Sequence, residues 1–305
     1  MADRKIVAVD QLVKAFPMRS RGGAPAFVAV DRVSFVMEEG ETLGLVGETG
    51  AGKSTIGRCL LGLETPSAGR IELFGQATTS LSMGGWKEMR RQMQAVFQDP
   101  KGAMNPRWTV NELVAEPLRR LAGASAADAE ARVEKSLLAV GLGGEFLGRY
   151  RHQLSGGQQQ RVNIARALAV EPRLIILDEP ISALDSSVKR DIVKLLDMLQ
   201  RDRKLAYLMI SHDLDAVRIL CRRMIVLFRG RIVEMGPVRA LTGAPAHPYT
   251  RRLFAAQLSL PRCDTGPSVL AQTNDDDPWT LDGDPPPIAD VVQIGDGHFV
   301  ARGTV

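Results

Sequence analysis

Short apolar stretches bounded by glycine, proline or charged residues recur along the first hundred residues of the chain. Stretches of this length are typical of β-strands. The pattern predicts four strands, at residues 5–9, 32–36, 41–47 and 70–75. A helix is predicted through residues 56–63, between the third strand and the fourth.

The sequence becomes helical in character from about residue 108 to residue 152. Residues 109–121 and 125–142 each have a helical composition, and Ser125 with Asp128 forms a capping pattern at the start of the second helix. The apolar residues on one face of that helix are Val133, Leu137 and Val140.

Strands and helices alternate from residue 170 onward. The predicted strands lie at 173–177, 205–210, 223–228 and 231–236, and the predicted helices lie at about 186–202 and near 213–220. Apolar strands separated by helices are typical of a mostly parallel sheet with both faces covered.

The last 45 residues have a different composition. Residues 261–305 contain six prolines, eight aspartates and only two arginines, so we expect loose packing there. The other 260 residues hold 37 basic and 27 acidic side chains, a balance that suits nucleotides or anionic surfaces. Because the basic residues are scattered and no aromatic residues alternate with them, we predict no nucleic-acid partner.

The overall composition, 45% hydrophobic and 24% charged, is typical of a soluble globular protein. No apolar run approaches the roughly 18 residues that span a bilayer, and the first ten residues lack the apolar core of a secretory signal. Cys59, Cys221 and Cys263 are far apart, which predicts no disulfide framework, zinc site or metal cluster. We expect a cytosolic chain unless a partner tethers it to a membrane.

A glycine-rich loop between a predicted strand and a predicted helix matches the pattern G-x-x-x-x-G-K-[ST]. Its glycines allow backbone amides to approach phosphate oxygens closely. Lys53 supplies charge to the β- and γ-phosphates, and Ser54 can ligate Mg²⁺. The loop predicts a nucleoside triphosphate site rather than a plain glycine turn. Its residues are Gly47, Glu48, Thr49, Gly50, Ala51, Gly52, Lys53, Ser54 and Thr55.

Two carboxylates follow the apolar strand at 174–177. Asp178 stands at the carboxyl end of that strand, where open α/β sheets bind their ligands, and it can hold a metal ion through water. Glu179 can polarise an attacking water. The alternative is a pair of acids that only starts a loop or caps a helix; the glycine loop in the same chain favours the chemical interpretation.

Two further polar residues follow apolar stretches in the same way. His212 comes after the strand 205–210 and could contact the γ-phosphate or the attacking water, although a cap or packed histidine is the alternative. Gln98 follows residues 93–97 and can coordinate magnesium and orient water; alone, it would be an ordinary loop residue.

The stretch Leu-Ser-Gly-Gly-Gln at 154–158 opens a second predicted helix whose free amides suit an anion. The alternative is a well-capped helix with no ligand. The chain thus carries two phosphate-seeking helix starts about a hundred residues apart.

Taken together, residues 5–258 resemble the ATP-binding subunits of ABC transporters. The resemblance rests on the order and spacing of the glycine loop, Gln98, the 154–158 stretch, the strand with Asp178 and Glu179, residues 182–185 and His212. It implies an α/β P-loop NTPase fold of the ABC type: a mixed, mostly parallel sheet with an N-terminal antiparallel β subdomain and a helical subdomain inserted at about 105–155. The nucleotide-binding domain would cover 1–258, and a C-terminal extension of the oligopeptide-transporter type would cover 259–305.

The resemblance also implies roles for individual residues. Ser54, Gln98 and Asp178 would hold Mg²⁺, Glu179 would be the general base, and His212 would be the switch. Phe16 stands where the family has an aromatic that stacks on adenine, although Phe27 competes for this role. Two such domains would face head to tail, so that each completes the partner's ATP site in trans with Ser155, Gly156, Gly157, Gln158 and Asp185.

Within the family, the chain is most similar to the oligopeptide, dipeptide and nickel importer branch. The residues that indicate this branch are 96–110, 240–253 and 294–303. Thr49 and Ala51 stand where this branch often has Ser and Cys, and Ile181 stands where Thr is common. Only Cys263 is available for a C-terminal cysteine cluster, so we predict no such cluster.

The implied function is an ATPase that energises an importer for oligopeptides or dipeptides, with nickel or another small solute as the alternative. Its partners would be a second ATPase subunit, identical or homologous, two membrane permeases and an extracytoplasmic solute-binding protein. It would lie on the cytoplasmic face of the plasma (inner) membrane. Two rival hypotheses are a soluble ABC protein that acts on DNA or ribosomes and a non-catalytic nucleotide sensor. A single glycine loop without a heptad run argues against the first, and the intact Glu179 and His212 argue against the second.

Overall fold

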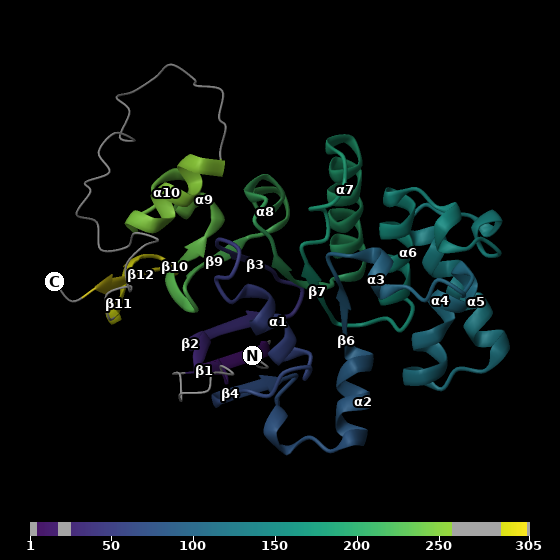
Figure 1. The fold of residues 1–305 in the computed structure, drawn as a ribbon, viewed down its shortest axis with the longest axis horizontal. Helices are drawn as coiled ribbons and strands as arrows, with labels where there is room; N and C mark the ends of the chain where they lie inside the picture. Colours follow the sequence, from purple (N-terminus) through teal and green to yellow (C-terminus); the bar gives the residue numbers. More distant parts are fainter. Residues whose placement is uncertain (1–4, 18–25, 258–287, 304–305) are drawn as a thin grey trace.

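The strands of the chain form two sheets (Figure 1). The computed structural model describes residues 5–17, 26–257 and 288–303. The strands of this part are β1 (Lys5–Phe16), β2 (Phe27–Glu38), β3 (Thr42–Val46), β4 (Ala68–Leu73), β5 (Gln76–Ala77), β6 (Met93–Val96), β7 (Leu174–Asp178), β8 (Ala206–Ile210), β9 (Arg223–Phe228), β10 (Arg231–Pro237), β11 (Ile288–Gly295) and β12 (His298–Gly303).

The helices of the described part lie between strands along the chain, and several follow one another with no strand between them. They are α1 (Lys53–Leu60), α2 (Met83–Gln92), α3 (Pro100–Ala103), α4 (Val110–Pro117), α5 (Ala126–Ala139), α6 (Gly156–Leu168), α7 (Ser186–Arg203), α8 (Leu214–Leu220), α9 (Val238–Gly243) and α10 (Pro248–Gln257). Four short turns of tighter or wider helix complete the set: η1 (Thr78–Ser80), η2 (Leu118–Ala122), η3 (Gly144–Phe146) and η4 (Arg151–Gln153).

The larger sheet has the order β11-β12-β10-β9-β3-β8-β7-β6, and the smaller sheet has the order β2-β1-β4-β5. The five strands from β9 to β6 are parallel, whereas β10, β11 and β12 pair antiparallel. The smaller sheet is antiparallel throughout. These sheets confirm the predicted α/β fold with a mixed, mostly parallel core and an N-terminal antiparallel unit.

The parallel strands are buried on both faces, as their continuous apolar sequences predict. Alternate residues of β7 belong to two different cores: Ile175 and Leu177 pack with the helices, and Leu174 and Ile176 pack against the antiparallel unit. Because both faces of these strands are buried, the strands are fixed in place, and so are the polar residues that follow their carboxyl ends.

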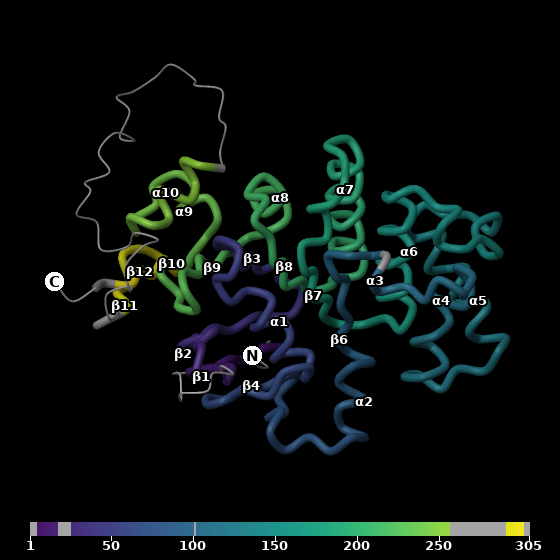
Figure 2. The backbone as a smooth tube through the Cα atoms, in the orientation of Figure 1, coloured from purple at the N-terminus to yellow at the C-terminus, as the bar shows by residue number. Residues whose placement is uncertain are grey.

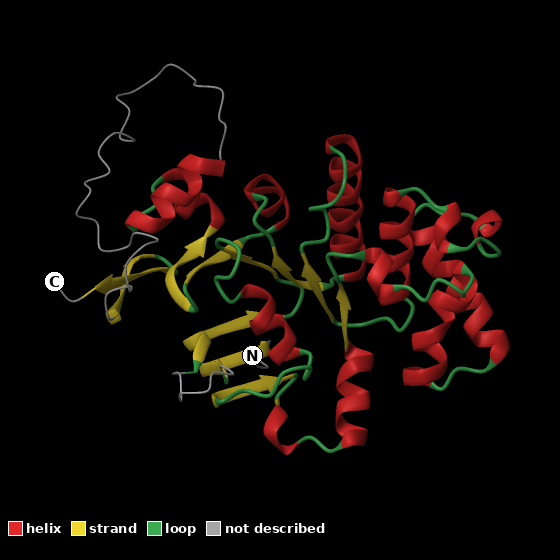
Figure 3. Cartoon of the chain, in the orientation of Figure 1, coloured by secondary structure: helices red, strands yellow, loops and turns green. Residues whose placement is uncertain are grey.

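The helical region between β6 and β7 packs as one group at the side of the sheet (Figures 2 and 3). The predicted cap of α5 is confirmed, because Ser125 Oγ accepts a hydrogen bond from the Asp128 amide at 3.2 Å. Val133, Leu137 and Val140 are buried, which confirms the predicted apolar face. The helical character predicted over 109–121 is confirmed; the helix widens after Pro117, where α4 ends and η2 continues.

The C-terminal segment differs from its prediction. Residues 288–303 form the β11–β12 hairpin, in which β12 pairs with β10 and extends the larger sheet. The prediction of loose packing is therefore wrong for this hairpin, because its alternating apolar residues supply a strand pattern that the prolines upstream obscured. Residues 261–287 and Cys263 lie outside the described residues.

Candidate nucleotide-binding site

The glycine loop connects the carboxyl end of β3 to the start of α1. Its glycines meet two separate demands. Gly47 and Gly52 have φ angles of 150° and 100°, and a Cβ atom at either position would lie 2.3 Å from a carbonyl oxygen, that of Leu227 or Ala29 respectively. Gly50 has a φ of 85° with no atom within 4 Å of a Cβ there, so its requirement is conformational.

Lys53 holds the loop closed. Its ammonium Nζ donates to the carbonyl oxygens of Gly47 and Glu48, each at 2.7 Å, and the residue is 5% exposed. Burial lowers the pKa of Lys53, and the carboxylates of Glu179 and Asp178 oppose that shift. A cation held among carbonyls in this way is placed to exchange them for phosphate oxygens.

The first acid of the predicted pair contacts the loop's helix directly. Ser54 Oγ donates to Asp178 Oδ1 at 2.9 Å, which joins the start of α1 to the carboxyl end of β7. Burial raises the pKa of Asp178, and the Ser54 hydrogen bond opposes that shift. A partly buried carboxylate beside a hydroxyl is an oxygen-rich place for a hard cation such as Mg²⁺.

The second acid has a different hydrogen-bonding partner. Glu179 has a left-handed backbone, with a φ of 50°, and its amide donates to the Ile210 carbonyl at 2.8 Å. Its Oε1 lies 3.1 Å from Nδ1 of His212, which follows β8. Strands β7 and β8 thus bring the base candidate and the switch candidate together, while Asp178 bonds to Ser54.

Gln98 lines the same cavity as two of the other predicted residues. Ser54, Asp178 and Gln98 all line a cavity of about 700 Å³ between the sheet and the helical region. The structure therefore gathers the three predicted magnesium ligands around one space, with Gln98 on its exposed side.

The second helix start lies elsewhere. In Figure 1, α6 lies well apart from α1, on the far side of β6 and β7. Ser155 caps α6 reciprocally with Gln158: Ser155 Oγ accepts from the Gln158 amide at 3.3 Å, and Gln158 Oε1 accepts from the Ser155 amide at 2.9 Å. A Cβ on Gly157 would lie 2.7 Å from Val188, so this helix start packs against the start of α7, where the exposed Asp185 stands.

The two adenine candidates are neighbours. Phe16 and Phe27 are direct partners in the β1–β2 register, and direct partners on antiparallel strands share a face of the sheet. The Lys14 ammonium lies 4.8 Å from the centre of the Phe16 ring, whereas Phe27 is 55% exposed. The ring of Phe27 is thus the more open of the two.

Sequence patterns missed a residue that touches the loop. The hydroxyl of Tyr249, in α10, accepts a hydrogen bond from the Glu48 amide at 3.2 Å, and the side chain is 1% exposed. The contact joins residues 201 positions apart, and residues around 249 had indicated only a branch of a family. A local sequence pattern cannot predict a contact between residues so far apart in the chain.

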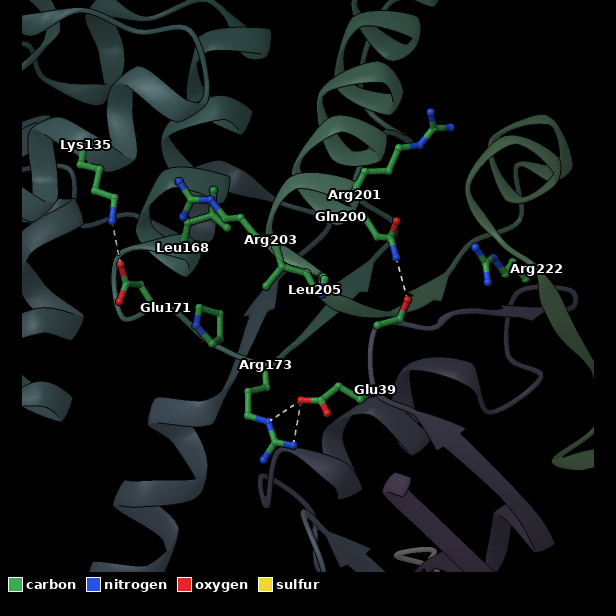
Figure 4. A pocket seen from close by; sticks show the side chains of 13 residues that line it. Glu39, Lys135, Leu168, Glu171, Arg173, Gln200, Arg201, Arg203, Leu205 and Arg222 are labelled. Carbon is green, nitrogen blue, oxygen red and sulfur yellow. Dashed lines mark hydrogen bonds and ion pairs between the residues drawn. The ribbon is translucent and has the colours of Figure 1, made fainter. Parts of the chain in front are cut away.

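A second cavity, of about 1010 Å³, lies near the residues that precede β3, β7, β8 and β9 (Figure 4). Among its charged residues, Arg173 pairs with Glu39 and Lys135 pairs with Glu171, both at 3.0 Å. Arg201 stands in the last turn of α7, where a positive charge favours the helix dipole. Helix ends and ion pairs therefore account for its basic character, and its lining includes none of the residues predicted for nucleotide chemistry.

Comparison with known protein families gives a match over residues 30–182 to the family described as ABC transporter. A Brucella abortus (strain 2308) protein named as a peptide import ATP-binding protein is 47% identical over 264 residues, which cover 86% of this chain and 78% of that protein. The glutathione import ATP-binding protein GsiA of Escherichia coli (strain K12) is 43% identical over 301 residues, 97% of this chain but 48% of its own length.

Solved structures agree in fold. A dimeric post-hydrolysis state of the ATP-binding cassette MJ0796, bound to ADP and Pi, aligns with a TM-score of 0.68 at 31% identity. It covers 76% of this chain and 99% of the other. The cbiO1 protein from Clostridium perfringens, part of the ABC transporter complex cbiONQ, aligns with a TM-score of 0.69 at 26% identity over 84% of this chain and 96% of that one.

Proposed function

Since the chain belongs to the ABC transporter family of ATP-binding proteins, we propose that its residues drive an importer of peptides. It is an ATP-binding, ATP-hydrolysing subunit of an ABC importer. The two relatives described above carry the names of a peptide importer and of an importer of glutathione, itself a tripeptide. Both names support a short peptide as the transported substrate.

One observation carries the mechanism: the Ser54–Asp178 and Glu179–His212 contacts lie at the same edge of the sheet. Lys53 exchanges its two carbonyl partners for oxygens of the β- and γ-phosphates. Glu179 accepts a proton from the attacking water, and His212 orients that carboxylate through its ring nitrogen. ATP and water then yield ADP and phosphate.

Magnesium fits the residues around Asp178. The Ser54 hydroxyl, the Asp178 carboxylate and the Gln98 amide supply oxygens around one cavity, and a cation there would offset the burial that raises the pKa of Asp178. When bound, Mg²⁺ neutralises charge on the transferred phosphoryl group. The three side chains hold and orient it.

A second ATPase subunit completes each site in this proposal. The starts of α6 and α7 place Ser155, Gly156 and Asp185 on one exposed surface, away from the chain's own glycine loop. A partner facing head to tail would present these residues to the γ-phosphate, since helix starts favour anions. The dimeric state of the aligned MJ0796 cassette supports this arrangement.

The cavity that holds the magnesium candidates extends to the helical region, and that part of it, apart from Ser54 and Asp178, is our proposed contact for a membrane permease. Its lining includes apolar residues, among them Leu63, Phe97 and Leu121, and basic ones, among them Arg58 and Arg90. In the described part of the chain, every helix is too short or too polar to cross a bilayer. Attachment to the cytoplasmic face of the membrane would therefore depend on two permeases, with a solute-binding protein delivering the peptide from outside.

The test is reconstitution of this chain with the permeases and binding protein that co-purify with it. We expect Mg²⁺-dependent ATP hydrolysis that rises when the loaded binding protein is added, together with uptake of labelled peptide into vesicles. Mass spectrometry of the binding protein identifies the peptide. Hydrolysis without uptake of any short peptide would overturn the substrate class, and absence of ATP binding would overturn the whole proposal.

A further inference from the structure

A fully buried carboxylate joins three distant segments of the chain. Glu234, in β10, is 0% exposed. Its Oε1 lies 2.7 Å from Nε2 of His298 and accepts from the Ala246 amide at 2.9 Å, and its Oε2 accepts from the His247 amide at 3.0 Å. A buried carboxylate is tolerated only when donors satisfy it, so these contacts fix the turn before α10 and the β11–β12 hairpin to β10.

The turn held by Glu234 in turn places Tyr249. His247 is 1% exposed, and its Nδ1 accepts a hydrogen bond from the Tyr249 amide at 3.2 Å at the start of α10. The Tyr249 ring packs on Phe228 at the end of β9, with ring centres 4.4 Å apart. Backbone and ring are therefore both fixed, which leaves the hydroxyl with one direction.

That direction is toward the glycine loop. Tyr249 Oη accepts from the Glu48 amide, and the Glu48 carbonyl in turn accepts from Lys53 Nζ. Burial raises the pKa of Tyr249 to about 12, so the phenol is neutral at physiological pH. A continuous series of contacts thus runs from His298 in the C-terminal hairpin to the lysine of the phosphate cradle.

We propose that Tyr249 is a positioning residue for the glycine loop, held in place by Glu234 and His298, so that the C-terminal hairpin sets the affinity of the loop for ATP. The proposal rests on the ATPase function proposed above. The Glu48 amide lies in a loop with three left-handed glycines, and its hydrogen bond to Tyr249 reduces the number of conformations that the loop must give up on binding phosphate.

The chain offers a matched control for this hydroxyl. Tyr207, in β8, is 0% exposed, and its hydroxyl has no hydrogen-bond partner among the described residues. Tyr249→Phe and Tyr207→Phe each remove one buried hydroxyl and keep the ring. Only the first removes a contact with the loop.

Equilibrium binding of Mg·ATP to the full chain is the first measurement. We expect Tyr249→Phe to raise the Kd about fivefold, the effect of one lost hydrogen bond. Tyr207→Phe should leave it unchanged. In the assembled transporter, Tyr249→Phe should raise KM for ATP and leave kcat unchanged. An unchanged Kd in Tyr249→Phe overturns the proposal, whereas failure of the unmodified chain to bind Mg·ATP overturns the proposed function instead.

Hydrogen exchange supplies a local measurement. In the nucleotide-free chain, Tyr249→Phe should speed exchange of the Glu48 amide, and Tyr207→Phe should not. Protection of that amide equal to the unmodified chain overturns the proposal.

The link to the hairpin is tested with His298. His298→Ala should weaken ATP binding about as much as Tyr249→Phe, the double variant should be no weaker than either single one, and His298→Gln, which keeps an N–H donor, should recover part of the affinity. Additive effects, or His298 variants with unchanged affinity, would overturn the role of the hairpin.

Discussion

The two glycine-bearing helix starts, at α1 and at α6, differ in how far their polar groups are buried and hydrogen-bonded within the chain. At α1, the residue Lys53 is buried, and its ammonium is bonded to two loop carbonyls. At α6, the residues Ser155 and Gly156 are exposed, and the reciprocal cap with Gln158 uses the Ser155 and Gln158 amides. The first start is held by contacts within the chain, whereas the second is exposed, as our proposal of a contact with a partner subunit requires.

The largest expected effect is on the rate of ATP hydrolysis, with no effect on ATP affinity. Glu179→Gln keeps the size of the side chain but removes the proposed base, so we expect hydrolysis in the assembled transporter to fall by about 10²–10⁴-fold while ATP affinity is kept. Single-turnover hydrolysis and equilibrium ATP binding measure the two quantities. Glu130→Gln, on the exposed face of α5, is the control for a lost carboxylate. Full activity in Glu179→Gln would exclude the base assignment.

The next effect concerns the buried cation. Lys53→Ala removes a charge-assisted contact with phosphate and also frees the carbonyls of Gly47 and Glu48, so we expect the Kd for Mg·ATP to rise about 100-fold or more. Calorimetric titration measures the Kd, and circular dichroism checks that the fold persists. An unchanged affinity would contradict the role of the cradle.

A substitution at the start of α6 should reduce hydrolysis without changing ATP affinity, unlike Lys53→Ala. A Cβ on Gly156 would lie 3.7 Å from Leu184, an ordinary contact, so Gly156→Asp is tolerated within the chain. We expect ATP affinity of the single subunit to be unchanged and hydrolysis to fall about 10–100-fold, because the new carboxylate would face the partner's γ-phosphate. Gly157→Asp is a poorer test, since its Cβ would lie 2.7 Å from Val188.

Gly148→Asp is the matched control for that substitution. It adds the same charge at an exposed glycine of the helical region with no atom within 4 Å of a Cβ there. Equal loss of hydrolysis in both variants would remove the distinction between the two helix starts.

Much of the fold and of the candidate site could be predicted because the signals are local. The strand that ends at Asp178 and the strand that precedes His212 are continuous apolar runs, and the glycine loop is a contiguous pattern. The left-handed turn at Glu179 has no such signal, since it depends on the hydrogen bond to the neighbouring strand at Ile210. The Tyr249 contact depends on a chain segment 201 positions away.

The smallest expected effect sharpens the choice that the sequence left open. We expect Phe27→Ala, at the more exposed ring, to raise the Kd for ATP about three- to tenfold, the range of one aromatic stacking contact. Inorganic tripolyphosphate, which has no base to stack, should bind equally to both forms. A larger effect of Phe16→Ala on ATP would assign the adenine contact to Phe16 instead.

The strand order of the larger sheet has a consequence for synthesis on the ribosome. The β3 strand pairs with β8 and β9, about 160 to 180 residues later, and β10 receives its neighbour β12 only after another 60 residues. Until β12 emerges, the nascent chain carries an uncovered strand edge, which is a template for aggregation. Stalled or prematurely terminated products of this gene should therefore depend on chaperones more than the finished chain does.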